Sequence, residues 1–343
     1  MTRFLVTIFH LGLAASGLTL SANSAAEPTD ELVQKISTHV VKVQVALANG
    51  AYGLGSGVVV AKDQVATNCH VIANAVSVSV NSNGENYSAS ALKSDWHHDL
   101  CILKTEGLIA PVANIGFSED LKYEQPVYTV GFASFSPRPN ATFGFVKGLY
   151  PMDDSLVIRA SNAFRLGDSG GGMFDEAGNL VGIVTVKSPG RNAFYYNMSV
   201  EWVKKLLNQP EQSITTPSEL AFWAEKEEKW PFFMRVVHPL KTEDWIALNK
   251  IATQWTEKEP NTTEALYYCA VAEYGLKNTI YAELHLKQVV AMNSNHASAL
   301  YYLGLIAEEN GKRIEALNLF AALNVLDITA ANDLKAAMGI KVD

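Results

Sequence analysis

Hydrophobic residues change their spacing partway along the chain, and the change divides it into two regions. From residue 40 onward, short apolar or alternating runs are separated by turns rich in glycine, asparagine and proline. Many short strands with such turns are typical of an all-β barrel or sandwich. Strands are predicted at 40–45, 58–60, 76–80, 100–104, 127–130, 143–146, 156–159 and 180–186, after a short amphipathic helix at 29–37.

The second region begins near Asn208-Gln209-Pro210 and has the apolar spacing of helices. Helices are predicted at 219–229, 243–255, 264–274, 280–292, 298–310, 313–326 and 331–338. The sequence Ala-Leu-Tyr-Tyr at 265–268 returns at 299–302, an offset of 34 residues, and Ala282 returns as Ala316. A period of 34 residues in pairs of helices is similar to that of the tetratricopeptide repeat. Chance similarity between the helices of a plain bundle is the alternative interpretation.

The first 26 residues have the pattern of a secretory signal peptide. A short basic start containing Arg3 precedes a mostly apolar run at 4–20, and small residues follow up to Ala25 and Ala26, where we expect cleavage. A membrane anchor is the alternative, but the run is short for a bilayer. No later apolar run approaches the length of a spanning helix. The sequence therefore predicts an exported protein, periplasmic or secreted, with no integral membrane segment after cleavage.

Composition narrows the functional classes. The chain has 343 residues, 48% of them hydrophobic and 18% charged, which is typical of globular domains. The net charge is −8, and removing Arg3 with the predicted leader leaves 26 basic against 35 acidic residues. Because the chain is acidic and has no cluster of Lys and Arg, we expect no nucleic-acid partner. The sequence has three cysteines and no set of His, Cys or Asp residues with the spacing of metal ligands. We therefore expect no metal site and no other cofactor. We expect a signal peptide at 1–26, a β-rich domain at 27–210 and a helical domain at 211–343.

Three segments of the β-rich region carry residues suited to nucleophilic catalysis. They contain His70, then Asp99, then Ser169 within Gly167-Asp168-Ser169-Gly170-Gly171-Gly172. A serine hydroxyl needs an adjacent base, and an imidazole base needs a carboxylate that fixes its tautomer. A glycine-rich turn can aim backbone N–H donors at an oxyanion, here those of Gly167 and Ser169.

These segments resemble the chymotrypsin-like serine proteases, and within them the bacterial trypsin-like, HtrA/Deg-type branch. The likeness covers roughly residues 30–205 and rests on Gly-Ser-Gly-Val-Val at 55–59, Thr-Asn-Cys-His-Val-Ile at 67–72, Asp-Leu-Cys-Ile-Leu at 99–103 and Gly-Asp-Ser-Gly-Gly at 167–171. It implies two six-stranded antiparallel barrels with a catalytic triad in the cleft between them. His70 takes the place of the base, Asp99 of the orienting acid and Ser169 of the nucleophile.

Other residues compete for two of these roles. Asp95 is the weaker alternative for the acid, and His97 and His98 are interpreted as loop residues near the cleft. The sequence Gly-Asp-Ser-Gly-Gly also fits the nucleophile turn of α/β-hydrolases. That fold requires a histidine after the serine, and every later histidine lies in the helical region, so chain order opposes this interpretation.

The chain departs from the Deg-type pattern in two places. Asp168 stands where that branch usually has asparagine, and a buried carboxylate needs a partner, such as Arg165, or access to solvent. The Deg-type branch usually ends in PDZ modules, whereas this chain ends in predicted helices. The family's oligomeric cage and peptide-triggered activation are therefore not expected here.

The resemblance also implies secondary site residues. Cys69 and Cys101 are expected on neighbouring strands, where they form either a disulfide bond or two buried free thiols. Ala163, six residues before the serine, takes the place of the base of the primary specificity pocket, which favours small or medium apolar side chains. The strand edge at Thr185-Val186-Lys187 is expected to pair with the backbone of a substrate.

The function predicted from the sequence is that of an exported serine endopeptidase. It would hydrolyse polypeptides through the triad and a backbone oxyanion hole, and the helical repeats would bind a partner protein or the substrate. The alternative is a proteolytically latent or silent scaffold that binds peptides or proteins through its repeats.

Overall fold

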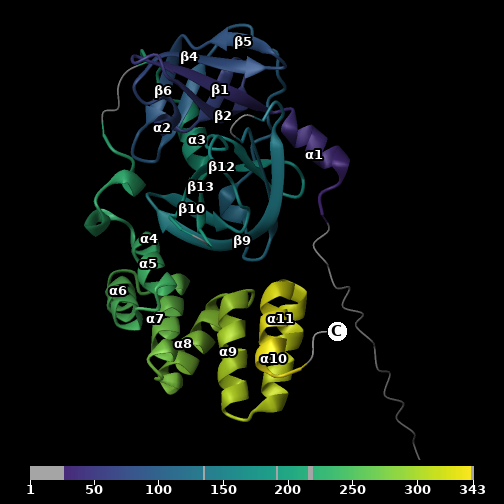
Figure 1. Cartoon of the computed structure of the whole chain (residues 1–343), viewed down its shortest axis with the longest axis vertical. Helices are drawn as coiled ribbons and strands as arrows, with labels where there is room; N and C mark the ends of the chain where they lie inside the picture. Colours follow the sequence, from purple (N-terminus) through teal and green to yellow (C-terminus); the bar gives the residue numbers. More distant parts are fainter. Residues whose placement is uncertain (1–26, 134–135, 191, 215–218, 341–343) are drawn as a thin grey trace, which may run out of the picture.

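The computed structural model describes residues 27–133, 136–190, 192–214 and 219–340, and the predicted signal peptide lies outside them. Two antiparallel β-sheets come first, and a helical region follows (Figure 1). This confirms the predicted fold class. Among the described residues, no helix combines the length and apolar character needed to cross a membrane.

The two edges of the first sheet are connected by one interrupted strand, so the sheet curls into a barrel. Helix α1 (Asp30–Ser37) precedes it, and its strand order is β5-β4-β1-β2-β3-β7-β6. Only Ala89 and Ser90 separate β5 from β6; Ala89 N–H donates to Val78 of β4 and Ser90 N–H to Lys104 of β7, both at 2.9 Å. Residues 85–95 thus act as one bent strand joining both edges, so seven strands appear where six were expected. The strands are β1 (Val40–Leu47), β2 (Tyr52–Ala61), β3 (Gln64–Thr67), β4 (Ala75–Ser82), β5 (Glu85–Ser88), β6 (Ala91–Asp95) and β7 (Leu100–Lys104).

The second sheet is a closed barrel of six strands in the order β10-β13-β12-β11-β8-β9. The loop 161–171, which carries Ser169, connects β10 to β11. Helix α3 (Val200–Leu207) follows the barrel and packs against β6 and β7 of the first sheet as well as β12. The strands are β8 (Pro126–Gly131), β9 (Asn140–Met152), β10 (Ser155–Ala160), β11 (Gly172–Phe174), β12 (Leu180–Lys187) and β13 (Tyr195–Ser199).

From residue 232 onward, helices make up most of the described chain. They are α4 (Phe232–Arg235), α5 (Val237–Lys241), α6 (Trp245–Lys258), α7 (Thr263–Gly275), α8 (Thr279–Met292), α9 (Ala297–Glu309), α10 (Arg313–Leu326) and α11 (Ile328–Ala337). Helix α9 begins 34 residues after α7, and α10 begins 34 residues after α8. The spacing of the helices therefore matches the period in the sequence, while the tetratricopeptide assignment stays a prediction.

The helix predicted at 219–229 is wrong. Two short 3₁₀ turns, η2 (Phe222–Ala224) and η3 (Glu227–Lys229), stand there instead, and Glu225 between them has extended backbone. Phe222 is buried, and its N–H donates to the carbonyl of His97 at 3.0 Å. A tertiary contact with the first sheet thus overrides the helical spacing of apolar residues.

Aromatic residues join the second barrel to the helices in one continuous core. Tyr150 of β9 stacks on Phe233 of α4 with ring centroids 4.5 Å apart, and Trp255 of α6 stacks on Tyr268 of α7 at 6.1 Å. Lys147 of β9 adds an ion pair to Asp327 at 2.7 Å, at the start of α11. The helical region is therefore packed directly under the second barrel (Figure 1).

Glu264 in the first turn of α7 makes stability sensitive to pH. Its side chain is buried, its Oε1 has no hydrogen-bond partner among the described residues, and burial raises its pKa to about 8. The folded state retains this proton after the unfolded state has lost it, so stability falls as pH rises from about 4.5 to about 8. For Glu264→Gln we expect a melting temperature that exceeds the parent's by a margin growing across this range. Glu257→Gln, a change at an exposed position, is the control. If the melting temperatures of the parent and of Glu264→Gln depended on pH in the same way, the assignment would be contradicted.

Candidate active site

The carboxylate of Asp99 holds His70 by two hydrogen bonds. His70 lies in α2 (Cys69–Ile72), directly after β3, and Asp99 directly precedes β7. Asp99 Oδ1 accepts the backbone N–H of His70 at 2.8 Å, and Asp99 Oδ2 lies 2.6 Å from Nδ1 of the ring. Asp99 is 1% exposed, whereas the His70 side chain is 35% exposed. The carboxylate of Asp99 is therefore buried and fixed, and Nε2 of His70 lies on the side of the ring away from that carboxylate.

The backbone around Asp99 is held as firmly as its side chain. Asp99 has a φ of 58°, a left-handed conformation that is costly for a residue with a Cβ. Its carbonyl accepts hydrogen bonds from Asn68 Nδ2 at 2.9 Å and from the N–H of Cys69 at 3.2 Å. Asn68 Nδ2 also lies 3.0 Å from Oγ1 of Thr185 in β12, and this contact connects the two barrels beside His70.

Glycine is required in the loop that presents Ser169. Gly167 and Gly170 have φ values of 96° and 87°, and a Cβ on Gly170 would stand 2.1 Å from the carbonyl oxygen of Ser56. Ser56 in β2 secures the loop: its N–H donates to the Ser169 carbonyl and its hydroxyl to the Gly167 carbonyl, both at 2.8 Å. Close packing of the loop on β2 places Ser169 at the junction of the two barrels.

The reactive groups are not yet bonded to one another. The Ser169 hydroxyl donates to the carbonyl of Thr185 at 3.2 Å. Among the described residues, the ring of His70 forms a hydrogen bond through Nδ1 only. Catalytic hydrogen bonds are often long or missing before substrate binds. For the backbone N–H groups of Gly167 and Ser169, no acceptor is found among the described residues. Both N–H groups are therefore unpaired within the described chain.

Asp168 finds its partner in the backbone of Arg165. The Arg165 N–H donates to Asp168 Oδ2 at 2.7 Å, while Oδ1 is buried without a hydrogen-bond partner among the described residues. Burial raises the pKa of Asp168, and the hydrogen bond from Arg165 opposes that rise. The predicted partner is thus present, but it acts chiefly through its amide. Asp168, Arg165 and Ala163 line a cavity of about 600 Å³.

The predicted specificity residues lie in different environments. Ala163 is exposed beside this cavity, and Lys187 is exposed at the end of β12. Thr185 is 2% exposed, and its hydroxyl donates to the Ile183 carbonyl at 2.9 Å. Its side chain is therefore structural, and only its backbone faces the serine.

An aromatic residue that no sequence pattern revealed packs against the histidine. Trp223 of η2 meets the His70 ring edge-on, with centroids 5.5 Å apart. Its Nε1 is buried without a hydrogen-bond partner among the described residues. The only sequence signal was the Phe-Trp pair at 222–223, which was assigned to a helix. The Trp223 segment, 221–224, thus partly covers the candidate base.

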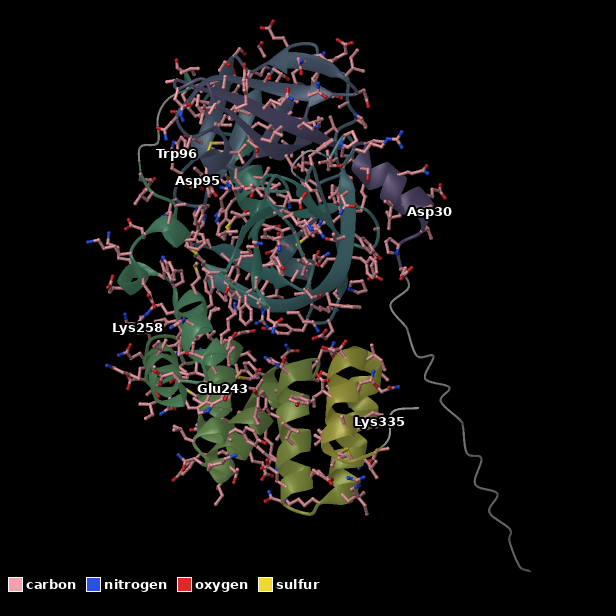
Figure 2. The ribbon with its side chains drawn as sticks, viewed as in Figure 1. Asp30, Asp95, Trp96, Glu243, Lys258 and Lys335 are labelled. Atoms are coloured by element: carbon pink, nitrogen blue, oxygen red, sulfur yellow. A yellow bond between two sulfur atoms is a disulfide. The ribbon has the colours of Figure 1, made fainter. Side chains whose placement is uncertain are left out.

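Asp95 pairs with a different histidine from the one that Asp99 holds. Asp95 Oδ2 lies 2.7 Å from Nδ1 of His98, and Asp153 lies 3.2 Å from both His97 and His98. Asp95 and the neighbouring Trp96, labelled in Figure 2, mark the end of β6 above the second barrel. Asp99 is therefore the carboxylate that contacts His70, and the second group of side chains is separate from it.

Comparisons with known proteins find similarity over the β-rich region that carries this site. Residues 55–183 match the family model described as trypsin-like peptidase domain. A probable periplasmic serine endoprotease, DegP-like, of Pseudomonas putida is 35% identical over 139 residues, which are 39% of this chain and 29% of the relative. A relative of the same description from Hahella chejuensis is 32% identical over 168 residues, 46% of this chain and 36% of its own. The chain thus spans about a third of the length of these relatives.

A solved structure extends the likeness to the fold. The active form of the Rv3671c protease from M. tuberculosis aligns with a TM-score of 0.50 and 21% identity, covering 57% of this chain and 92% of that chain. The β-rich region therefore has a fold similar to that of a protease of known structure. Over residues 55–183 the chain is similar to trypsin-like peptidase domains and to DegP-like serine endoproteases.

Cys69 and Cys101 form a disulfide bond, which resolves the alternative left open by the sequence. It closes a loop with a sequence separation of 32 and ties the segment carrying His70 to the strand after Asp99. Closing such a loop typically contributes about 2–4 kcal/mol. We expect the Cys69→Ala/Cys101→Ala variant to lose about that much unfolding free energy in urea. The parent treated with reductant should fall to the same value; equal stability of the oxidised parent and the variant would contradict this role.

Proposed function

We propose that this protein is an exported serine endopeptidase that hydrolyses polypeptides. Ser169 is the nucleophile, His70 the general base and Asp99 the residue that orients His70. The N–H groups of Gly167 and Ser169 form the oxyanion hole. The proposal gives the segments 1–26, 27–210 and 211–343 the roles of signal peptide, protease domain and helical repeat domain.

The observation that carries the proposal is the Asp99–His70 pair inside a trypsin-like peptidase domain. A carboxylate 2.6 Å from Nδ1 selects the tautomer whose Nε2 can accept a proton. The domain match spans all three residues of the proposed triad. The relatives named as periplasmic serine endoproteases support both the reaction class and export.

The geometry suggests how the reaction would proceed. His70 Nε2 takes the proton of Ser169 as the hydroxyl oxygen attacks the peptide carbonyl, and it returns the proton to the leaving amine. Asp99 stays ionised and stabilises the imidazolium. For this transfer the Ser169 hydroxyl must turn from the Thr185 carbonyl toward His70. The two unbonded N–H groups then face the charge that develops on the carbonyl oxygen.

The helical region exposes large apolar side chains that a partner or the substrate could contact. Large apolar side chains are exposed on α8 and α10; they are Ile280, Tyr281, Leu284, Ile314 and Leu317. Exposed apolar groups on stacked helix pairs are typical of peptide-binding repeats. We propose that the helices recruit a polypeptide while the barrels cleave.

Two contacts favour the second candidate function, a latent protease-fold scaffold. The Ser169 hydroxyl is bonded to Thr185 and not to His70, and Trp223 covers one edge of the His70 ring. In that case the helical repeats would supply the binding function, and the site would stay silent until the Trp223 segment moves.

Labelling with a fluorophosphonate separates these two candidates. We expect covalent labelling of the mature protein at Ser169, because only an activated serine attacks this reagent readily. Ser169→Ala should lose the label and lower peptide hydrolysis by a factor of about 10³ or more. The exposed Ser77→Ala is the matched control and should label like the parent. A folded parent that stays unlabelled would exclude an open, competent site.

Removal of the Trp223 ring tests whether the segment restrains the site. Trp223→Ala should raise the labelling rate of Ser169 several-fold, because it uncovers the edge of His70. Leu220→Ala, an exposed change just outside the same segment, should leave the rate unchanged. A slower rate in Trp223→Ala would show instead that this ring supports His70 or the substrate.

A further inference from the structure

His98 is held by Asp95 in the same way as His70 is held by Asp99. Asp95 Oδ1 accepts the backbone N–H of His98 at 3.0 Å, and Asp95 Oδ2 lies 2.7 Å from Nδ1 of the ring. The proton on Nδ1 therefore points at Asp95, and a neutral His98 ring presents the lone pair of its Nε2 on the opposite side. An outer carboxylate bonded to Nδ1 is the usual support of a metal-binding histidine.

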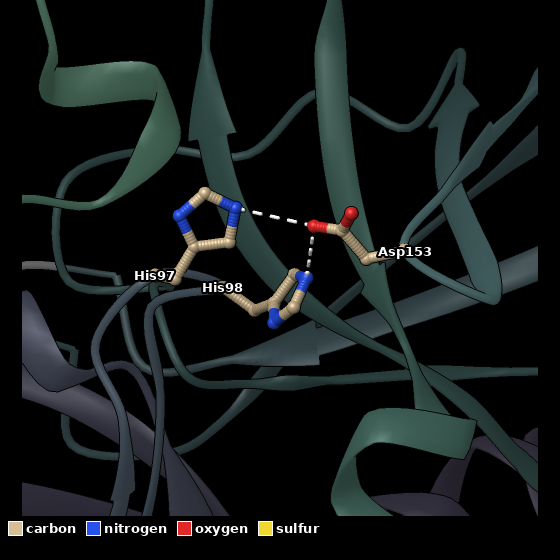
Figure 3. Close-up of side chains that lie close together, drawn as sticks. All are labelled: His97, His98 and Asp153. Carbon is tan, nitrogen blue, oxygen red and sulfur yellow. Dashed lines mark hydrogen bonds and ion pairs between the residues drawn. The ribbon is translucent and has the colours of Figure 1, made fainter.

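Figure 3 shows that His97 and His98 each direct a ring nitrogen at the same oxygen of Asp153. Asp153 Oδ2 lies 3.2 Å from Nε2 of His98 and 3.2 Å from Nε2 of His97, and all three atoms are within 4.8 Å of one another. A lone pair facing a carboxylate oxygen at this distance is repulsive unless a proton or a cation lies between them. The arrangement thus has a place for a positive charge.

The two separations from Asp153 fit a small tetrahedral ion. Zinc binds nitrogen and carboxylate oxygen at about 2.0–2.1 Å, so neighbouring donors of a tetrahedral site lie about 3.3–3.4 Å apart. Both separations from Asp153 are close to this value. Two histidines and one carboxylate leave a fourth position for water, and the exposed side of Asp153 leaves room for it.

The surrounding structure fixes these side chains and favours a cation. Trp202 of α3 stacks on the His98 ring with centroids 4.0 Å apart, and its Nε1 donates to the Asp153 carbonyl at 3.4 Å. Asp153 stands in the β9–β10 turn, with a φ of 44°. Beside it lies a cavity of about 710 Å³ with five acidic lining residues, which are Glu119, Asp153, Asp154, Glu201 and Glu259. Such a concentration of carboxylates attracts divalent cations.

We propose that His97, His98 and Asp153 bind a divalent transition-metal ion, with Zn²⁺ as the best match. The ion would clamp the β6–β7 connection of the first sheet to the β9–β10 turn of the second barrel. Its anchor on the first sheet, His98, directly precedes Asp99. The sequence could not predict this site, because the two histidines are adjacent while Asp153 comes from a distant hairpin. The site is independent of the proposed catalytic function, and either proposal can fail alone.

Zinc binding is measured directly on the mature chain produced without a histidine tag. We expect calorimetry to give one Zn²⁺ per chain, and Co²⁺ substitution to give the visible absorption of a four-coordinate site. Asp153→Asn removes the shared ligand while asparagine suits the left-handed turn, so this variant should fold and lose at least tenfold in affinity. Asp95→Asn should weaken binding by about 10–100-fold through the orientation of His98.

The exposed His238→Gln is the matched control and should bind zinc like the parent. Zinc should also raise the melting temperature of the parent and of this control, but not that of Asp153→Asn. The proposal is overturned if the parent binds no zinc at micromolar concentrations, or if Asp153→Asn binds as tightly as the parent.

Discussion

The buried carboxylate of Asp99 is the constraint on which the site depends. It accepts one hydrogen bond from the backbone of His70 and one from its ring, so it fixes both the position and the tautomer of that residue. Its own backbone is held in a left-handed conformation by Asn68 and Cys69. A carboxylate removed from water is costly unless such bonds compensate it. The stability of this corner and the orientation of the imidazole therefore have a single physical origin.

The two barrels meet through this corner. The side-chain amide of Asn68 donates hydrogen bonds to both barrels, to the Asp99 carbonyl in the first and to the Thr185 hydroxyl in the second. Ser56 does the same for the serine loop, because it contacts both Gly167 and Ser169 from β2. Small polar side chains at fixed positions thus hold the proposed base of the first sheet and the proposed nucleophile of the second barrel at one junction.

Sequence patterns predicted most of the strands and helices, for reasons that are local. The alternation of β4, the apolar run of β12 and the periodicity of α7 to α10 are visible within single elements. Shorter strands such as β3 and β11 were missed because they hold too few residues to show a pattern. The Trp223 segment and the group around Asp153 were missed because they depend on contacts between distant parts of the chain.

The aromatic core shared by the second barrel and the helices bears on how the molecule unfolds. Tyr150 and Tyr196 in the barrel are almost fully buried, and both contact Phe233 of the helical region. Without the helices, this underside of the barrel would present a large apolar surface to water. We therefore expect the barrel and the helices to melt in one cooperative transition, and a chain cut after the barrel to aggregate.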